Sequence, residues 1–147
     1  MSLNDRILDD LKTAMKARDE VGKRTLRSLR SELGKRELEL GRPMEPAEEL
    51  GVLVGAVKSR RDSVEAYEAA DRSDLADSER AEIMVIERYL PAALSEEEAR
   101  TEIAALAEEL GVSTRKDMGR LMQAVMGRFR GQIDGKLASR IAASLLS

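Results

Sequence analysis

The stretch SEEEARTEIAALAEELG, residues 95–111, decides the fold class of this chain. Ser95 is followed three residues later by Glu98, which is the spacing of a capping box, in which each side chain satisfies the other's backbone N–H. Apolar residues then recur three and four apart, as on one face of an α-helix, and Gly111 can form a left-handed C-cap. The stretch therefore predicts a capped amphipathic helix that ends at Gly111.

The composition extends this prediction to the whole chain. Charged residues make up 36% of the 147 residues and hydrophobic residues 42%, and the latter are mostly Ala and Leu. Such residues lose little entropy in a helix, whereas strands favour β-branched and aromatic side chains. The aromatic residues are only Tyr67, Tyr89 and Phe129. We therefore expect an all-α protein.

The helical spacing recurs on both sides of residues 95–111 and predicts seven helices in all. Four precede this stretch: one starts after Ser2 with Met15 on its apolar stripe, one stops before Gly41, one starts at Pro46, and one is capped by Ser73 or Asp74 and carries Leu90. Two follow it: one opens at Thr114 or Asp117 and carries Phe129, and one follows the Asp134-Gly135 turn and carries Leu145.

A boundary between two groups of helices is predicted at Pro91. The residue before a proline avoids helical angles, so the fourth helix should end there. The capping box at Ser95 then starts a new helix. We expect a four-helix N-terminal lobe over residues 1–93 and a three-helix C-terminal lobe over residues 94–147.

The chain contains no histidine and no cysteine, which excludes Ser-His-Asp and Cys-His catalysis and an ordinary zinc site. No glycine-rich loop follows a strand, so a phosphate cradle is missing. Asp71, Asp74 and Asp77 lack the ligand spacing of a calcium loop and fit a helix-entry turn better. We expect no catalytic centre, no cofactor and no metal.

No apolar run reaches 18 residues, and no apolar signal-peptide core follows Met1. We therefore expect neither a membrane segment nor an export segment. The absence of cysteine fits a reducing compartment, and the predicted location is cytoplasmic.

Charge is distributed unevenly behind a formal net charge of −3. Residues 62–87 and 95–110 are acidic, whereas residues 12–42 and 111–147 are rich in Lys and Arg. Such blocks can be solvated faces that pair with one another, or they can bind a polyanion. The candidate nucleic-acid-binding residues are Lys116, Arg120, Arg128, Arg130, Lys136 and Arg140, with a further basic face around Lys23, Arg27 and Arg30.

Three other features have both a structural and a functional interpretation. Arg60 and Arg61 can lie along apolar surface and reach acids of the fourth helix, or they can bind an anion. Gly119 and Gly127 inside the sixth helix indicate a close helix approach or a ligand near the backbone. The methionines of the sixth helix fit core packing better than a binding groove.

Five segments, in order along the chain, resemble the YqeY family, whose members resemble the C-terminal part of the GatB subunit of tRNA-dependent amidotransferase. These segments, with support from Leu26-Arg27, are Lys58-Ser59-Arg60-Arg61-Asp62-Ser63-Val64-Glu65, Arg72-Ser73-Asp74-Leu75, Tyr89-Leu90-Pro91, Asp117-Met118-Gly119-Arg120 and Asp134-Gly135-Lys136. The resemblance covers nearly the whole chain. One departure is Asp71, which stands where the family usually has glycine.

The resemblance implies an all-helical fold of two lobes, of which the second is similar to the tail domain of the amidotransferase. In that enzyme, the tail domain helps to hold tRNA. The glutaminase and kinase-like active sites of that enzyme lie in other domains and another subunit. A label of carbon–nitrogen ligase with glutamine as amido donor would therefore be inherited from the full enzyme. We expect a non-catalytic module that binds tRNA, or alternatively an adaptor that docks onto an aminoacyl-tRNA synthetase or an amidotransferase subunit.

Overall fold

The computed structural model describes all residues from 1 to 147 and contains seven α-helices and no strand. The helices are α1 (Leu3–Lys16), α2 (Glu20–Leu40), α3 (Pro46–Ala69), α4 (Ser73–Glu87), α5 (Glu96–Leu110), α6 (Met118–Arg128) and α7 (Gly135–Leu145), and a 3₁₀ turn, η1, spans Arg115–Asp117. The predicted all-α fold of four helices followed by three is confirmed.

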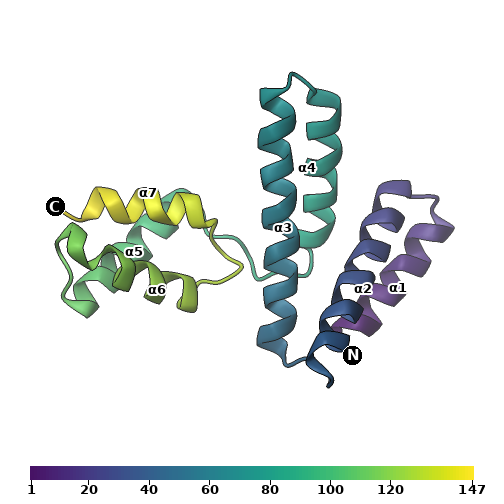
Figure 1. Cartoon of the computed structure of the whole chain (residues 1–147), viewed down its shortest axis with the longest axis horizontal. Helices are drawn as coiled ribbons and strands as arrows, with labels where there is room; N and C mark the ends of the chain where they lie inside the picture. Colours follow the sequence, from purple (N-terminus) through teal and green to yellow (C-terminus); the bar gives the residue numbers. More distant parts are fainter. The chain divides into compact units, whose positions relative to one another are not determined.

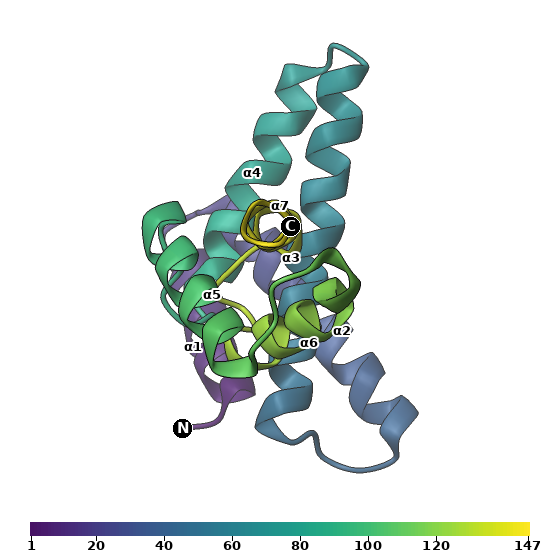
Figure 2. The same ribbon diagram turned by 90° about the vertical axis from the view of Figure 1, so that its left-hand side faces the viewer.

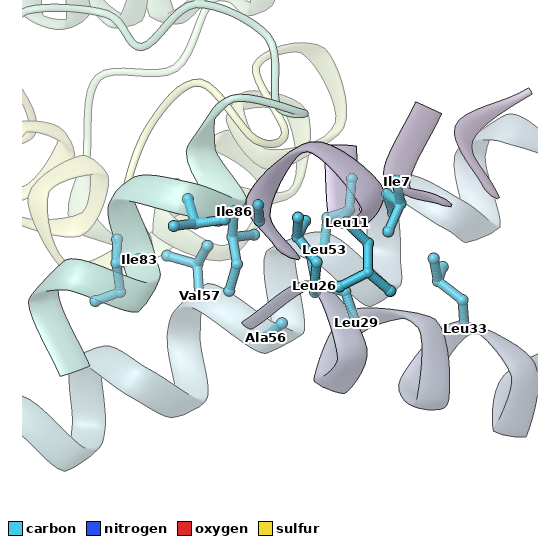
Figure 3. Packing of buried hydrophobic residues seen from close by; sticks show 12 residues of the cluster. Ile7, Leu11, Leu26, Leu29, Leu33, Leu53, Ala56, Val57, Ile83 and Ile86 are labelled. Carbon is cyan, nitrogen blue, oxygen red and sulfur yellow. The ribbon is translucent and has the colours of Figure 1, made fainter. Parts of the chain in front are cut away.

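The chain divides into two compact units, Met1–Leu90 and Pro91–Ser147. In the N-terminal unit, α1 and α2 form one helical hairpin and α3 and α4 form a second, longer one (Figure 1). The end of the second hairpin, around residues 70–72, projects past the first (Figure 1). All four helices contribute to one apolar core (Figure 3), whose labelled members are Ile7, Leu11, Leu26, Leu29, Leu33, Leu53, Ala56, Val57, Ile83 and Ile86.

The C-terminal unit has a core of its own. Figure 2 looks along α7, with α5 and α6 packed beneath it on either side. Ile103 from α5, Leu121 and Val125 from α6, and Ile141 from α7 are fully buried where the three helices meet. Each helix therefore turns its apolar stripe toward the other two, as its spacing predicts.

The predicted helix ends around α5 are confirmed. The Glu98 N–H donates to Ser95 Oγ at 3.0 Å, and the Ser95 N–H donates to Glu98 Oε1 at 3.1 Å. The hydrogen bond from the Ser95 N–H, followed by an interaction with the Ser95 side chain, holds the pKa of the Glu98 carboxyl below its usual value. Gly111 adopts φ +70°, the left-handed conformation of a C-cap, as does Gly41 after α2.

The predicted cap of α4 is wrong, whereas the predicted start of α6 is confirmed. Arg72 precedes the first residue of α4, and the carboxylate of Asp74 accepts from the Arg72 guanidinium at 3.2 Å instead of capping the helix. Before α6, the Asp117 N–H donates to the Thr114 carbonyl and forms η1. Asp117 then occupies the N-cap position of α6, which starts at Met118, although its side chain makes no capping hydrogen bond.

Two residues that the apolar spacing assigned to buried stripes lie at the surface. Met15 in the last turn of α1 is 50% exposed, and Leu145 at the end of α7 is 36% exposed. Leu146 has an extended backbone and is buried in place of Leu145. Helical spacing fixes which side a residue faces, but it does not fix how far the neighbouring helices extend.

The departure at Asp71 coincides with a left-handed backbone. Asp71 has φ +58° in the turn between α3 and α4, a conformation that glycine adopts without steric cost. Asp is one of the few other residues that visit this region, because its short side chain hydrogen-bonds locally. The turn therefore keeps the geometry that a glycine would favour.

The two glycines of α6 do not mark a close helix approach, which corrects one of the interpretations above. A Cβ atom added at Gly119 or at Gly127 would meet no atom within 4 Å. Both residues are exposed. Packing within the unit therefore does not require glycine at either position.

A Gly119→Ala, Gly127→Ala double variant is accordingly expected to be more stable than the native chain by about 1–2 kcal/mol, because alanine loses less backbone entropy on folding into a helix. Thermal unfolding followed by circular dichroism measures this effect. A lower melting temperature would mean that an added Cβ atom at one of these positions does clash with another part of the chain.

A fragment of residues 91–147 is expected to fold alone. Its backbone is tied together from the first residues, since the Leu94 N–H donates to the Gln132 carbonyl at 2.8 Å and Gln132 Nε2 donates to the Ala92 carbonyl at 3.3 Å. The fragment should show a helical circular dichroism spectrum and a cooperative melt. A coil spectrum would show that this small core needs the N-terminal unit.

Candidate nucleic-acid interface

The six predicted RNA-binding residues all lie at the surface of the C-terminal unit. Lys116 belongs to η1, Arg120 and Arg128 to α6, and Lys136 and Arg140 to α7, while Arg130 follows α6. Every one of these side chains is exposed. Lys136 and Arg140 share one face of α7, as expected from their spacing, but Lys116 and Arg120 do not share a helix.

Three of the six arginine and lysine side chains are held against α5. Arg120 donates to the Leu110 carbonyl at 3.2 Å, and Arg128 forms an ion pair of 3.1 Å with Glu109. Arg140 forms an ion pair of 3.1 Å with Glu96. The alternative in which basic residues pair with the fifth helix is thus realised for Arg128 and Arg140.

The positively charged side chains form two groups and not one cluster. Arg120 and Arg128 both reach the last two residues of α5, whereas Arg140 reaches its first residue, Glu96. These ends are about 20 Å apart at 1.5 Å per residue. A ligand that engages both groups must therefore be extended, as the phosphate backbone of a nucleic acid is.

Lys116 and Arg130 differ from the three arginines that contact α5 because they have no hydrogen-bond or ion-pair partner within the chain. Lys136 does have an interaction within the chain. Substitution of Lys116 and Arg130 therefore removes charge without removing a contact of the native fold, which makes these two residues the cleanest positions for testing the interface.

Arg60 belongs to a network that joins three helices of the N-terminal unit. Its Nε donates to Glu82 of α4 at 3.1 Å, and its NH2 group donates to Ser28 of α2 at 3.2 Å. Its NH1 group donates to the Ala56 carbonyl at 3.0 Å. The side chain is only 11% exposed, so the structural interpretation is confirmed for Arg60. Sequence spacing indicated an acid of the fourth helix but not the partner on α2.

Tyr89 fixes the end of α4 to α1. Its hydroxyl donates to the Asp10 carboxylate, and the Arg6 guanidinium lies 5.3 Å from the centre of its ring. Partial burial, followed by the hydrogen bond to Asp10, raises the pKa of the Tyr89 hydroxyl. A raised pKa keeps the hydroxyl protonated as a donor, so this group acts as an anchor and not as a base.

One shallow groove of about 500 Å³ lies on α3 and is lined by Gly55, Lys58, Ser59, Asp62, Ser63 and Ala66. All six residues come from a single helix face, and Lys58 and Asp62 are paired with each other at 3.2 Å. No group of three or more possible metal ligands is gathered anywhere in the structure. None of the helices has the length and apolar character needed to cross a membrane.

Comparison with known proteins agrees with the order of the sequence segments. Residues 4–146 match the family described as Yqey-like protein. The chain belongs to the YqeY family. A curated relative, Altered inheritance of mitochondria protein 41, mitochondrial, from Lachancea thermotolerans, is 34% identical over 105 residues. The match covers 69% of this YqeY-family chain and 56% of the relative, so the chain spans little more than half of that relative's length.

The segments that identify this YqeY-family chain contain many residues that hold the fold together. Arg60 joins α2, α3 and α4, Arg72 pairs with Asp74 in the turn before α4, and Tyr89 anchors α4 to α1. Arg120 of the fourth segment donates to the last carbonyl of α5. Lys116 and Arg130, the two candidate residues without a partner, lie outside these segments.

Proposed function

We propose that this chain is a non-catalytic module that binds tRNA through the basic residues of its C-terminal unit. The observation that carries the proposal is that an acid-poor segment, residues 111–147, folds so that all six candidate side chains are exposed. The apolar side chains of the same segment turn inward to the core. A surface of this kind suits phosphate contacts, which supply most of the affinity in sequence-independent nucleic-acid binding.

The ion pairs that Arg128 and Arg140 form with α5 are exposed and weak, so they are compatible with this proposal. In the Arg128–Glu109 pair the side chains are 52% and 59% exposed, and in the Arg140–Glu96 pair they are 69% and 57% exposed. Exposed pairs of this kind contribute about 0–1 kcal/mol, so a phosphate can replace the carboxylate at little cost. Both arginines therefore count among the proposed ligands.

The kind of RNA contact follows from the side chains present. Single-stranded RNA is usually held by aromatic side chains on which bases stack. The C-terminal unit contains one aromatic residue, Phe129, and it packs against the core. The proposed contacts are therefore to the phosphates and shape of folded RNA, which fits tRNA.

The resemblance to the GatB tail supports the same proposal and limits its scope. In the amidotransferase, the tail helps to hold tRNA while amidation takes place elsewhere. We propose that this chain contributes binding alone and that a carbon–nitrogen ligase activity would belong to a partner enzyme. Turnover of glutamine or ATP by rigorously purified protein would contradict this part of the proposal.

Filter binding of the full chain to bulk tRNA is the test. We expect binding that weakens steeply as the salt concentration rises. After ribonuclease treatment of the tRNA, the protein should retain no RNA on the filter. A pull-down from lysate with and without ribonuclease gives the complementary result. A synthetase or amidotransferase subunit retained after ribonuclease treatment, together with no binding of tRNA, would favour the adaptor function instead.

A further inference from the structure

The outer face of α2 carries two arginines that no other part of the chain engages. Arg27 and Arg30 are exposed and have no hydrogen-bond or ion-pair partner within the chain. Of the other bases of the helix, Lys23 pairs with Glu20 at 3.0 Å, Arg24 with Glu82 at 3.3 Å and Arg36 with Glu39 at 3.4 Å, whereas Lys35 has no partner. Arg27 and Arg30 are therefore the two arginines of α2 that have no partner within the chain.

Arg27 and Arg30 lie on the exposed face of α2 that adjoins its core side. Leu26, Leu29 and Leu33 fill the core side of the helix and are at most 2% exposed. Residues 27, 30 and 34 are separated by three and four positions, so they form one stripe, which is turned by about 100° from the stripe of the three leucines. The Cβ atoms of Arg27 and Arg30 are about 5–6 Å apart at this spacing. The two guanidinium groups can thus reach neighbouring anionic groups of one ligand.

Gly34 continues this stripe and leaves the backbone bare. A Cβ atom added there would meet no atom within 4 Å, so packing within the chain does not require glycine. Glycine in a helix interior costs about 1 kcal/mol relative to alanine. A bare stretch of helix one turn beyond two free arginines allows a ligand held by those arginines to approach the backbone closely.

We propose that the face formed by Arg27, Arg30 and Gly34 is a second binding surface for the phosphate backbone of folded RNA, located in the N-terminal unit. This inference rests on the proposed RNA-binding function and adds a surface that the C-terminal unit does not contain. Guanidinium groups match phosphate in a bidentate manner, and they remain charged at any physiological pH.

An RNA backbone fits this face better than a protein does. The only large apolar side chain that extends the stripe is Leu38, which is 84% exposed. A protein interface requires a buried cluster of apolar or aromatic anchors, and one leucine does not provide it. An RNA backbone needs no apolar anchors. Two unpaired positive charges beside an exposed stretch of helix backbone are sufficient for contacts to its phosphates.

The first test compares two charge reversals in the full chain with bulk tRNA as the probe. Arg27→Glu with Arg30→Glu is expected to weaken binding about tenfold in low salt, since two phosphate contacts are lost. The matched control is Lys12→Glu with Lys16→Glu on α1, which makes the same charge change at two exposed residues without partners. The control should weaken binding by about threefold or less, through long-range electrostatics alone. Equal losses in both variants would overturn the proposed surface.

The second test substitutes Gly34 and measures both stability and tRNA binding. If Gly34 had only a structural role, its substitution would not weaken tRNA binding while raising stability. Gly34→Gln should raise the melting temperature, because glutamine favours a helix, and yet weaken tRNA binding several-fold by blocking the backbone. Unchanged binding of tRNA by Gly34→Gln would contradict the close approach. Loss of binding to polyglutamate in Arg27→Glu with Arg30→Glu, without loss of binding to tRNA, would assign the face to an acidic protein instead.

The failure of this inference differs from the failure of the proposed function. If the native chain binds no tRNA in a salt-sensitive manner, both fail. If the native chain binds tRNA and Lys116→Glu with Arg130→Glu weakens that binding, but Arg27→Glu with Arg30→Glu does not, only the surface on α2 is excluded.

Discussion

Replacement of Arg60 by alanine is expected to destabilise the N-terminal unit by about 3 kcal/mol. Arg60 and Glu82 are 11% and 13% exposed, and removal of one partner leaves the other charge in a nearly buried site. The variant also loses the hydrogen bonds to Ser28 and to the Ala56 carbonyl. For a unit of this size, the melting temperature should fall by about 10 °C or more.

Urea or thermal unfolding followed by circular dichroism measures this change. Lys58→Ala is the control, because Lys58 pairs with Asp62 at the surface, where the two side chains are 76% and 53% exposed, and its loss should cost less than about 0.5 kcal/mol. Arg60→Met with Glu82→Met should lose much less stability than Arg60→Ala, since a buried ion pair replaced by apolar groups leaves no unpaired charge.

The same experiment checks whether Arg60 also contributes to binding of tRNA. If Arg60→Ala keeps the native melting curve but no longer binds tRNA, then Arg60 is an anion ligand and its contacts with Glu82 and Ser28 are incidental. We expect the opposite result, in which stability falls and tRNA binding by the remaining folded protein is maintained.

The affinity of the full chain for bulk tRNA is expected to fall about a hundredfold between 50 and 200 mM salt. Each phosphate contact releases a condensed counterion, and about four contacts from the C-terminal unit give a slope of this size. Lys116→Glu with Arg130→Glu should weaken binding at low salt about tenfold and reduce the slope by about two. Because neither residue has a partner within the chain, the melting curve should stay unchanged.

A second pair of substitutions separates RNA binding from internal pairing. In Lys136→Glu with Arg140→Glu, a new carboxylate at position 140 would face Glu96, which Arg140 contacts at 3.1 Å in the native chain. This variant should therefore lose both tRNA affinity and a small amount of stability, by less than about 1 kcal/mol. A native chain whose tRNA binding does not respond to salt would contradict the proposed phosphate interface.

The sequence by itself determined the helices and the residues on their buried faces. The capping box at Ser95 and Glu98 and the left-handed cap at Gly111 involve residues within one turn of each other, so the chain forms them without reference to distant segments. Apolar spacing identified the core side of each helix for the same reason, because three and four residues bring side chains to one face. The order of the five family segments also followed from the sequence alone.

Helix ends without a strong local signal were predicted less well. At the start of α4, Asp74 pairs with Arg72 and does not cap the backbone, whereas α6 starts directly after Asp117 as predicted. A capping pattern does not take such a competing side-chain partner into account. Met15 and Leu145 were assigned to buried stripes, but both lie in the last turn of their helices and are exposed, because no neighbouring helix covers them.

Only the tertiary structure decided which charges are paired and which are free. Arg60 and Glu82 are 22 residues apart, and Arg140 and Glu96 are 44 apart, so no spacing rule joins them. The sequence identified the basic surface as a set of candidates, but packing of the helices engaged Arg128 and Arg140 and left Lys116 and Arg130 without partners. Helix formation rests on contacts within a few residues, whereas ion pairing depends on which helix faces meet, and that is fixed only when the core closes.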